Sequence, residues 1–149
     1  LAAEPSLLIA DEPTTALDVS VQAQVLTLLT DLVHRHGASV VLITHDMSVI
    51  SETCDRVAVM YAGDIVEVGG VETVIFHPKH PYTQGLMRAI PDETRTELIG
   101  IPGTVPDLVQ PPSGCRFHPR CPHAEDRCRR EKPADQDLGS GHRAACHLL

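Results

Sequence analysis

The feature that most constrains this chain is a pair of short aliphatic runs, residues 6–11 and 39–44, that flank a stretch with helical periodicity. Both runs are rich in Leu, Ile and Val, which is typical of strands buried in a parallel sheet. Between them, Val21, Val25 and Leu28 recur at the spacing of one helix face. Because parallel strands need a crossover connection, the pattern predicts a strand–helix–strand unit whose two strands lie centrally in an α/β sheet.

The ends of this helix and the elements after it can also be predicted. Ser20 suits the N-cap of the helix, and Gly37 suits the position just beyond its last residue. Further along, residues 56–62 and 65–69 are expected to be strands joined by a turn at Gly63-Asp64. Such closely spaced strands predict an antiparallel hairpin.

Proline and cysteine divide the chain into two parts. Ten of the 12 prolines follow Phe76, and four of the five cysteines follow Ser113. We therefore expect an aliphatic α/β domain over 1–76 and a small, irregular, Cys-rich metal-binding extension over 77–149. Within the extension, residues 92–114 are too rich in Pro and Gly for regular structure.

Composition limits the partners that this chain can have. Its 149 residues carry 12 Lys and Arg against 20 Asp and Glu, which gives a net charge of −8. A chain with this charge lacks the overall positive potential that attracts nucleic acid without sequence specificity. No apolar run reaches the ~20 residues that a membrane-spanning helix needs, and the first residues show no secretory signal. Because the chain opens without Met and in the middle of a pattern, we expect it to be part of a longer protein.

Polar side chains follow both of the expected buried strands. Asp11 and Glu12 close the first strand, and His45 follows the second. Functional groups of parallel sheets gather beyond the carboxyl ends of the strands, so these side chains are expected to converge. Successive residues of an extended chain point opposite ways, which predicts different targets for Asp11 and Glu12, a cation and a water. The residues alone leave open that the acids begin a solvated loop and that His45 is structural.

Three motifs, taken in order, resemble those of the ATP-binding subunits of ABC transporters. LLIADE (7–12) resembles a Walker B strand, TALD (15–18) resembles the D-loop, and ITHD (43–46) resembles the switch-histidine loop. The resemblance implies that residues 1–76 are the C-terminal part of an ABC-type P-loop ATPase domain with a parallel sheet core. It also implies ATP and Mg²⁺ as cofactors.

The same resemblance implies roles for four side chains. Asp11 would hold the Mg²⁺ of Mg-ATP, and Glu12 would orient or deprotonate the attacking water. His45 would contact the γ-phosphate, and Asp18 of the D-loop would lie at the dimer seam near the partner's nucleotide. Phosphoryl transfer depends on positioning and charge stabilisation of this kind.

Other motifs of that family do not occur in these residues. The chain contains no phosphate-binding loop of the form G-x-x-x-x-G-K-S/T and no LSGGQ signature. The backbone amides that cradle phosphate are therefore missing. We expect the parent protein to be an ABC-type ATPase and the 149-residue chain alone to be inactive.

The cysteines form a second group. Cys115, Cys121 and Cys128 are spaced C-x5-C-x6-C, and Cys146 follows. Metal binding can order a Pro-rich segment of this kind, because its binding energy becomes folding energy. The spacing leaves open an iron–sulfur cluster, zinc, or reduced free cysteines, although the close Cys pairs typical of zinc sites are absent.

A narrower resemblance involves the text HPYTQGLMRAIP (80–91) together with the cysteine spacing. Both resemble the C-terminal extension of the oligopeptide and dipeptide branch of ABC importers. In that branch the four cysteines are associated with a 4Fe–4S cluster, which implies Cys115, Cys121, Cys128 and Cys146 as its ligands, with zinc as the alternative.

The family resemblance also implies partners and a location. The partners are a second ABC ATPase subunit, two transmembrane permease subunits and, indirectly, an extracytoplasmic solute-binding protein, with no nucleic acid. The expected location is peripheral, on the cytoplasmic face of the inner membrane, and the expected function is ATP-driven import of di- or oligopeptides. A competing hypothesis is a non-catalytic metal-binding interaction or regulatory module derived from an ABC ATPase. A soluble ABC ATPase of repair or translation is disfavoured by the HPYT text and the cysteines.

Overall fold

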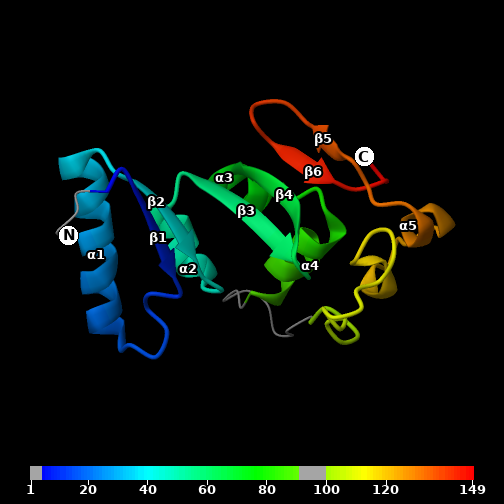
Figure 1. Cartoon of the computed structure of the whole chain (residues 1–149), viewed down its shortest axis with the longest axis horizontal. Coiled ribbons are helices and arrows are strands. Elements are labelled where there is room, and N and C mark those ends of the chain that lie inside the picture. The colour runs from blue at the N-terminus through cyan, green and yellow to red at the C-terminus, as the bar shows by residue number, and fades with distance from the viewer. Residues whose placement is uncertain (1–4, 91–99) are drawn as a thin grey trace. The chain divides into compact units, whose positions relative to one another are not determined.

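The computed structural model describes residues 5–90 and 100–149, and the chain divides into two compact units, Leu1–Cys54 and Asp55–Leu149. The first unit contains β1 (Leu7–Asp11), α1 (Val19–His36), β2 (Ser39–Ile43) and α2 (Met47–Thr53) (Figure 1). The second unit contains β3 (Arg56–Tyr61), β4 (Asp64–Gly70), α3 (Val71–Phe76), α4 (Pro81–Ala89), the 3-10 turn η1 (His118–Arg120), α5 (Asp126–Arg130), β5 (Asp135–Asp137) and β6 (Arg143–Ala145).

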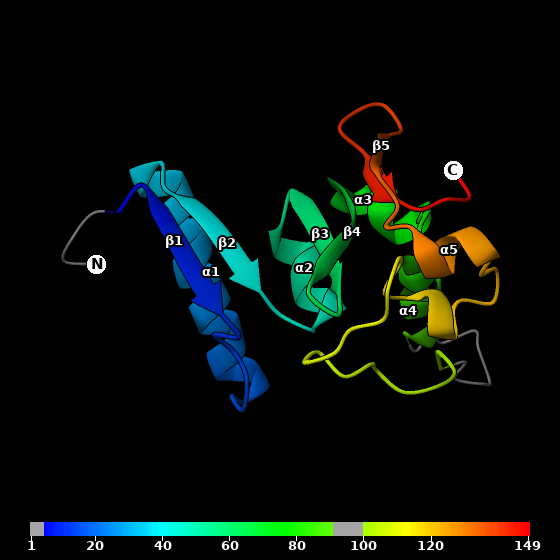
Figure 2. The same ribbon diagram turned by 45° about the vertical axis from the view of Figure 1, so that its right-hand side comes forward.

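The first unit is the expected strand–helix–strand arrangement. β1 and β2 pair in parallel, from Leu7 opposite Ser39 to Asp11 opposite Ile43, and α1 is the crossover between them. Figure 2 shows the two strands side by side in front of α1. The coarse prediction of an α/β fold with a parallel strand pair is therefore confirmed.

The expectation that both strands lie centrally in a sheet is not met within this chain. In the part of the chain that the structure describes, their sheet has two strands, so each has one neighbour. Leu7, Ile9, Val41 and Ile43 share one face of the pair and are 47–64% exposed. The alternate side chains, on the other face, are half-buried. The strands are aliphatic on both faces, but only one face is covered here.

The helix α1 begins earlier than its sequence suggested. Its N-cap is Asp18 and not Ser20, because Oδ1 of Asp18 accepts hydrogen bonds from the amides of Ser20 and Val21, each at 3.0 Å. A carboxylate satisfies these otherwise unpaired amides and complements the positive end of the helix dipole. The other end agrees with the prediction, since Gly37 is the C-cap and has a φ of 62°.

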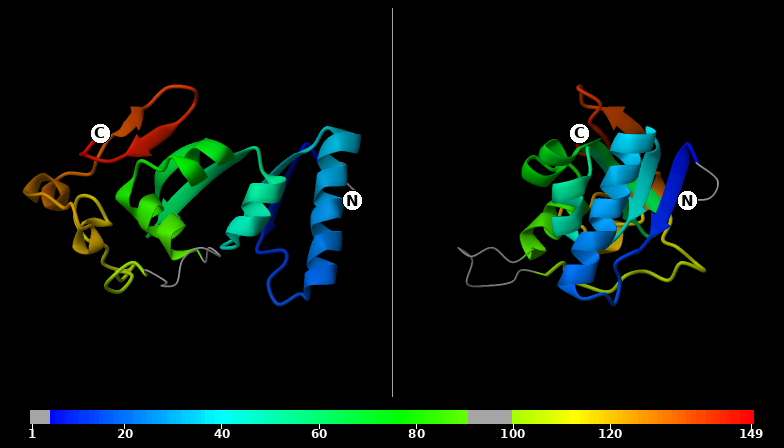
Figure 3. Two further views of the ribbon diagram at one scale, coloured as in Figure 1. Left: turned by 180° about the vertical axis from the view of Figure 1, so that it is seen from behind. Right: turned by 90° about the vertical axis from the view of Figure 1, so that its left-hand side faces the viewer.

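The second unit is built on an antiparallel sheet with the strand order β3-β4-β6-β5. The predicted hairpin is present as β3 and β4, and α3 contacts both of its strands (Figure 3). Its turn consists of Ala62 and Gly63, one residue earlier than expected, and Asp64 already pairs with Tyr61. Both turn residues have positive φ, 49° and 85°, which suits the right-handed twist of the flanking strands.

The hairpin belongs to the same compact unit as the cysteine segment. β6 near the C-terminus pairs with β4, with Glu67 opposite Ala144 and Val68 opposite Arg143. This pairing joins the two segments in one compact unit, Asp55–Leu149, while the domain boundary expected between residues 76 and 77 stays a prediction.

The Pro- and Gly-rich stretch agrees with its prediction where it can be compared. Residues 100–114 contain no helix or strand, while 92–99 lie outside the described residues. The described helices are all too short or too polar to cross a membrane.

Aromatic rings form the centre of the second unit. Tyr61, Tyr82 and Phe117 come from β3, from α4 and from the segment before η1, and their ring centroids lie 4.6–5.4 Å apart. Three of the four Tyr and Phe residues of the chain therefore meet in one cluster. Their separations are those of favourable tilted or edge-to-face pairs.

A buried carboxylate lies beside this cluster. Glu67 on β4 is 1% exposed and accepts three hydrogen bonds, from the amides of Lys79 and His80 at 2.8 and 2.9 Å and from Nε2 of His142 at 2.7 Å. The donors come from the entry to α4 and from the residue before β6. A single side chain thus links three segments of the unit.

Replacement of this carboxylate is expected to destabilise the second unit. Glu67→Gln keeps the size of the side chain but turns an NH₂ group toward donors, so we expect a loss of about 2–4 kcal/mol in the free energy of unfolding. Urea unfolding followed by tyrosine near-UV circular dichroism measures it. The control is Glu72→Gln, which changes an exposed carboxylate on α3. Equal effects of the two substitutions would contradict the role given to Glu67.

Candidate functional site

The register of β1 and β2 brings the ends of the two strands to the same level. Asp11 lies opposite Ile43, and the amide of Glu12 donates to the carbonyl of Ile43 at 2.8 Å. Glu12 itself has a φ of 44°, in the left-handed region that few residues other than Gly adopt. The chain therefore leaves the strand abruptly at Glu12.

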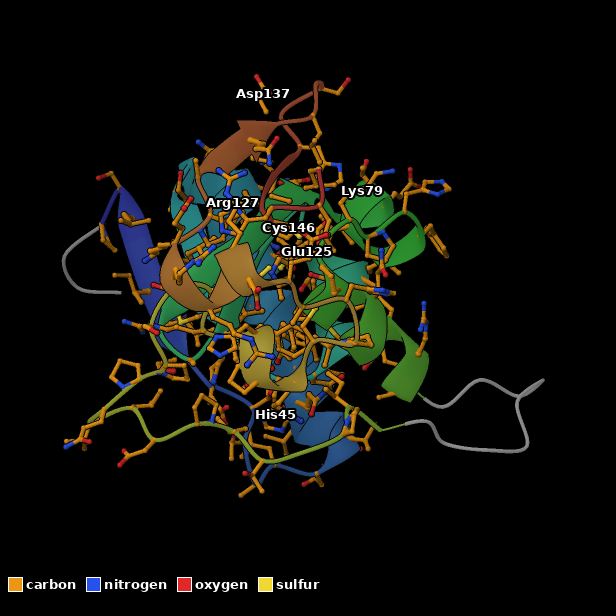
Figure 4. All side chains as sticks on the ribbon, turned by 90° about the vertical axis from the view of Figure 1, so that its right-hand side faces the viewer. His45, Lys79, Glu125, Arg127, Asp137 and Cys146 are labelled. Carbon is orange, nitrogen blue, oxygen red and sulfur yellow. The ribbon has the colours of Figure 1, made fainter. Side chains whose placement is uncertain are left out.

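The structure brings Glu12 and His45 together. Nδ1 of His45 donates to Oε1 of Glu12 at 2.9 Å, from the loops that follow β2 and β1. Both side chains are accessible to solvent, 78% for His45 and 41% for Glu12. His45 is labelled in Figure 4. Two groups that are 33 residues apart in the sequence thus form one accessible acid–imidazole pair.

A third side chain, that of Thr15, also contacts Glu12. The sequence analysis did not identify this contact. Oγ1 of Thr15 donates to Oε2 of Glu12 at 2.5 Å, so each carboxylate oxygen of Glu12 accepts one hydrogen bond. The signal was available in the sequence, because a hydroxyl three residues after an acid often bonds back to it in a turn.

These contacts shift the protonation of both groups. The hydroxyl of Thr15 and, after it, the imidazole of His45 hold the pKa of the Glu12 carboxyl below its ordinary value. The Glu12 carboxylate raises the pKa of His45. The two shifts agree in sign and favour the carboxylate–imidazolium form of the pair.

The structure also places the other two acids of this region. Asp11 is the last residue of β1 and lies on the exposed face that it shares with Leu7 and Ile9. Asp18 uses its carboxylate as the N-cap of α1. The structure therefore gives Asp18 a structural role, whereas its role at a dimer seam and the Mg²⁺ role of Asp11 stay predictions.

Asp46, next to His45, holds the loop in place. Its Oδ1 accepts from the amide of Ser48 at 2.9 Å and from the hydroxyl of Ser48 at 2.5 Å, which caps α2. Its Oδ2 accepts a longer hydrogen bond, 3.4 Å, from the Gln22 amide on α1. These contacts lower the pKa of Asp46, the Ser48 hydroxyl most of all, and tie the His45 loop to both helices.

The four C-terminal cysteines form a second candidate site. Cys115, Cys121, Cys128 and Cys146 are free thiols that line one small cavity of the second unit. The amide of Cys115 donates to the carbonyl of Cys128 at 2.9 Å, and Cys146, labelled in Figure 4, follows β6 directly. The fold thus gathers all four thiols that the sequence singled out.

Gly114 permits the close approach of the two cysteine segments. It has a φ of 67°, and a Cβ atom there would lie 2.4 Å from the carbonyl oxygen of Cys128. Any other residue would push the two backbones apart. The position of Cys115 in the cavity therefore depends on a glycine just before it.

The cavity favours the neutral thiol form of three of these cysteines. Burial raises the pKa of Cys115, Cys121 and Cys146, and the neighbouring thiols raise it further. Four thiolates would therefore need a positively charged partner. Within residues 5–90 and 100–149, no three His, Cys, Asp or Glu side chains are arranged to hold one metal ion, so neither the expected iron–sulfur cluster nor the zinc alternative finds support here.

His80 borders the same cavity, and the sequence analysis gave it no chemical role. Its ring is 1% exposed, and its Nδ1 accepts from the amide of Tyr82 at 3.1 Å, which caps α4. Burial lowers the pKa of His80 to about 4. The imidazole is therefore neutral near pH 7 and carries its proton on Nε2.

Known proteins match both parts of the chain. A family model described as "Oligopeptide/dipeptide transporter, C-terminal region" matches residues 66–128. The dipeptide transport ATP-binding protein DppD of Escherichia coli K12 is 47% identical over 149 residues, which are 99% of this chain and 46% of that protein. The probable peptide ABC transporter ATP-binding protein y4tR of Sinorhizobium fredii is 52% identical over 149 residues, 98% of this chain and 44% of the relative. The oligopeptide transport ATP-binding protein AppD of Bacillus subtilis is 49% identical over 150 residues, which are 99% of this chain and 46% of that protein.

These matches show which class of protein the chain resembles. With the acid and the histidine at two parallel strand ends, they make the chain similar over nearly its whole length to ATP-binding proteins of ABC transporters. Within that class, its similarity is to the ATP-binding proteins of peptide transporters. It spans about half the length of the curated relatives that it matches.

The pairing of Glu12 and His45 makes a prediction for titration by NMR. The pKa of His45 should lie above 6.5 and fall toward 6.5 in Glu12→Gln, because the neighbouring negative charge is lost. Since the pKa of Glu12 is lowered from 4.5 and that of His45 is raised, the charged contact should be complete between about pH 4.5 and 6.5. It should weaken at lower pH as Glu12 is protonated and at higher pH as His45 loses its proton.

The control for this titration is Asp31→Asn, which removes a charge on α1 that pairs with Arg35. This substitution should leave the His45 titration unchanged. An equal change of the His45 pKa in both variants, or none in either, would count against the contact in solution.

Proposed function

We propose that the protein containing this chain is the ATP-binding subunit of an ABC importer that takes up di- or oligopeptides and couples their transport to ATP hydrolysis. The observation that carries this proposal is the accessible Glu12–His45 pair at the ends of two parallel strands, in a chain similar to the ATP-binding proteins of peptide transporters. An exposed carboxylate next to an imidazole suits the activation of a water beside a phosphoryl group.

In this function each strand-end residue has one task. The Glu12 carboxylate accepts a hydrogen bond from the attacking water and orients it toward the γ-phosphorus. His45 donates from its ring to a γ-phosphate oxygen and so distinguishes ATP from ADP. Asp11, at the end of β1, would hold Mg²⁺ through water, and the metal would neutralise charge on the phosphates.

The proposed complex supplies what these 149 residues lack. The phosphate-binding loop and the signature motif come from the rest of the protein and from a second ABC ATPase subunit, with Asp18 near the seam between them. Two transmembrane permease subunits and an extracytoplasmic solute-binding protein complete the importer, with the ATPase on the cytoplasmic face of the inner membrane. The isolated chain does not hydrolyse ATP.

Substitution of Glu12 tests the proposed function. In the complete protein, Glu12→Gln should lower ATP turnover by about 100-fold or more, because a general base typically contributes that factor. Nucleotide binding should survive, since an amide of the same shape replaces the carboxylate. Phosphate release and equilibrium ATP binding measure the two effects. The control is Glu52→Gln on α2, and unchanged turnover in Glu12→Gln would refute the proposal.

We propose further that Cys115, Cys121, Cys128 and Cys146 hold a 4Fe–4S cluster. One observation supports this: the four free thiols line one cavity of the second unit. Four Cys thiolates are the usual ligands of a 4Fe–4S cluster. When bound, its iron–thiolate bonds would supply the positive charge that the buried thiols need and would link the segment 115–128 to the C-terminus.

Metal analysis tests this second proposal. The complete protein, purified without oxygen, should contain about four iron and four sulfide ions per chain. Cys128→Ser should remove most of this iron, because the side chain is buried at the cavity, whereas Cys54→Ser in the first unit should retain it. Stoichiometric zinc without iron would contradict the cluster.

A further inference from the structure

The hydroxyl of Thr15 makes an unusual contact among the threonines of the first unit. The hydroxyls of Thr27 and Thr30 donate to main-chain carbonyls within α1. Thr15 donates instead to a side-chain oxygen, Oε2 of Glu12, at 2.5 Å. Hydrogen bonds from a hydroxyl to a carboxylate are the short, strong kind, and this separation is typical of them.

From this contact we propose that Thr15 is a positioning residue for ATP hydrolysis, whose hydroxyl holds the Glu12 carboxylate in the orientation that activates water. The inference rests on the proposed function, since it assumes that Glu12 acts on that water. Thr15 itself need not touch the nucleotide. It acts through Glu12 alone.

The loop geometry keeps Thr15 in reach of the carboxylate. The amide of Thr15 donates to the carbonyl of Glu12 at 3.1 Å, and the amide of Leu17 donates to the carbonyl of Thr14 at 3.2 Å. These two overlapping turns fold the chain back over Glu12. Thr14 is only 8% exposed and anchors the loop, so the Thr15 hydroxyl is presented to Glu12 from a fixed backbone.

The contact has most effect when His45 is engaged elsewhere. In the structure, Oε1 of Glu12 accepts from His45 and Oε2 accepts from Thr15. In the proposed reaction the ring of His45 donates its hydrogen bond to the γ-phosphate, and its hydrogen bond to Glu12 weakens. Thr15 is then the remaining side-chain contact of a carboxylate that is 41% exposed and has three rotatable bonds. Without it, the carboxylate would spend most of its time in other rotamers.

The test compares three variants of the complete protein. Thr15→Val keeps the shape of the side chain but lacks the hydroxyl, and we expect kcat for ATP hydrolysis to fall about 10-fold, with KM and nucleotide affinity within about 2-fold. Thr15→Ser restores the hydroxyl and should recover kcat. Thr27→Val removes a matched hydroxyl on α1, which bonds to the Ala23 carbonyl, and should change neither constant.

Each outcome decides for or against the role of Thr15. Turnover of Thr15→Val equal to that of the parent would overturn it, and so would an equal loss in Thr15→Ser, because the methyl group and not the hydroxyl would then matter. A fall in nucleotide affinity with unchanged kcat would also overturn it. The double variant Glu12→Gln with Thr15→Val should be no slower than Glu12→Gln alone, since Thr15 acts only through Glu12.

Failure of this inference can be told apart from failure of the proposed function. If Glu12→Gln abolishes turnover and Thr15→Val does not reduce it, Glu12 keeps its role and only the inference about Thr15 is wrong. If Glu12→Gln turns over ATP normally, the proposed function itself is wrong, whatever Thr15→Val does.

Discussion

The parallel register of β1 and β2 is the constraint on which the candidate site depends. It places Asp11 opposite Ile43, so the chain leaves both strands at the same level and the amide of Glu12 still bonds to the second strand. A register shifted by one residue would turn the strand-end side chains to the other face of the sheet. The 2.9 Å contact between Glu12 and His45 is therefore a consequence of strand pairing. The Thr15 hydroxyl and the Asp46 cap then refine the geometry that the pairing sets.

The second unit depends on a different interaction, the set of hydrogen bonds that the buried carboxylate of Glu67 accepts. Glu67 accepts hydrogen bonds from two backbone amides and from His142, and these donors belong to segments that the hairpin alone could not hold. An unpaired buried charge is costly, so the three donors must arrive together. These hydrogen bonds and the aromatic cluster around Phe117 hold the Cys-rich segments in place. The four thiols of these segments line one cavity.

The sequence predicted what depends on periodicity and local turn chemistry, and it missed what depends on distant partners. The strand–helix–strand unit, the hairpin and the meeting of Glu12 with His45 follow from apolar runs and from where strands end. The N-cap of α1 was placed at Ser20 because a hydroxyl and a carboxylate both suit that position, and only the structure shows that Asp18 takes it. Glu67 was missed because its alternation suggests an exposed strand residue, and one of its donors, His142, lies 75 residues further along the chain. The roles of Asp11 and of the dimer seam depend on parts outside this chain.

The central claim is that Glu12 and His45 act on one γ-phosphoryl group, and the ring of His45 reports on it most directly. In the complete protein with Mg²⁺, ¹⁵N NMR of a histidine-labelled sample can compare a non-hydrolysable ATP analogue with ADP. The analogue should shift the Nδ1 resonance of His45 strongly, because the Nδ1 proton exchanges its hydrogen bond to Glu12 for one to a phosphate oxygen, and ADP should leave this resonance close to its nucleotide-free position. Equal shifts with both nucleotides, or none with either, would contradict the account.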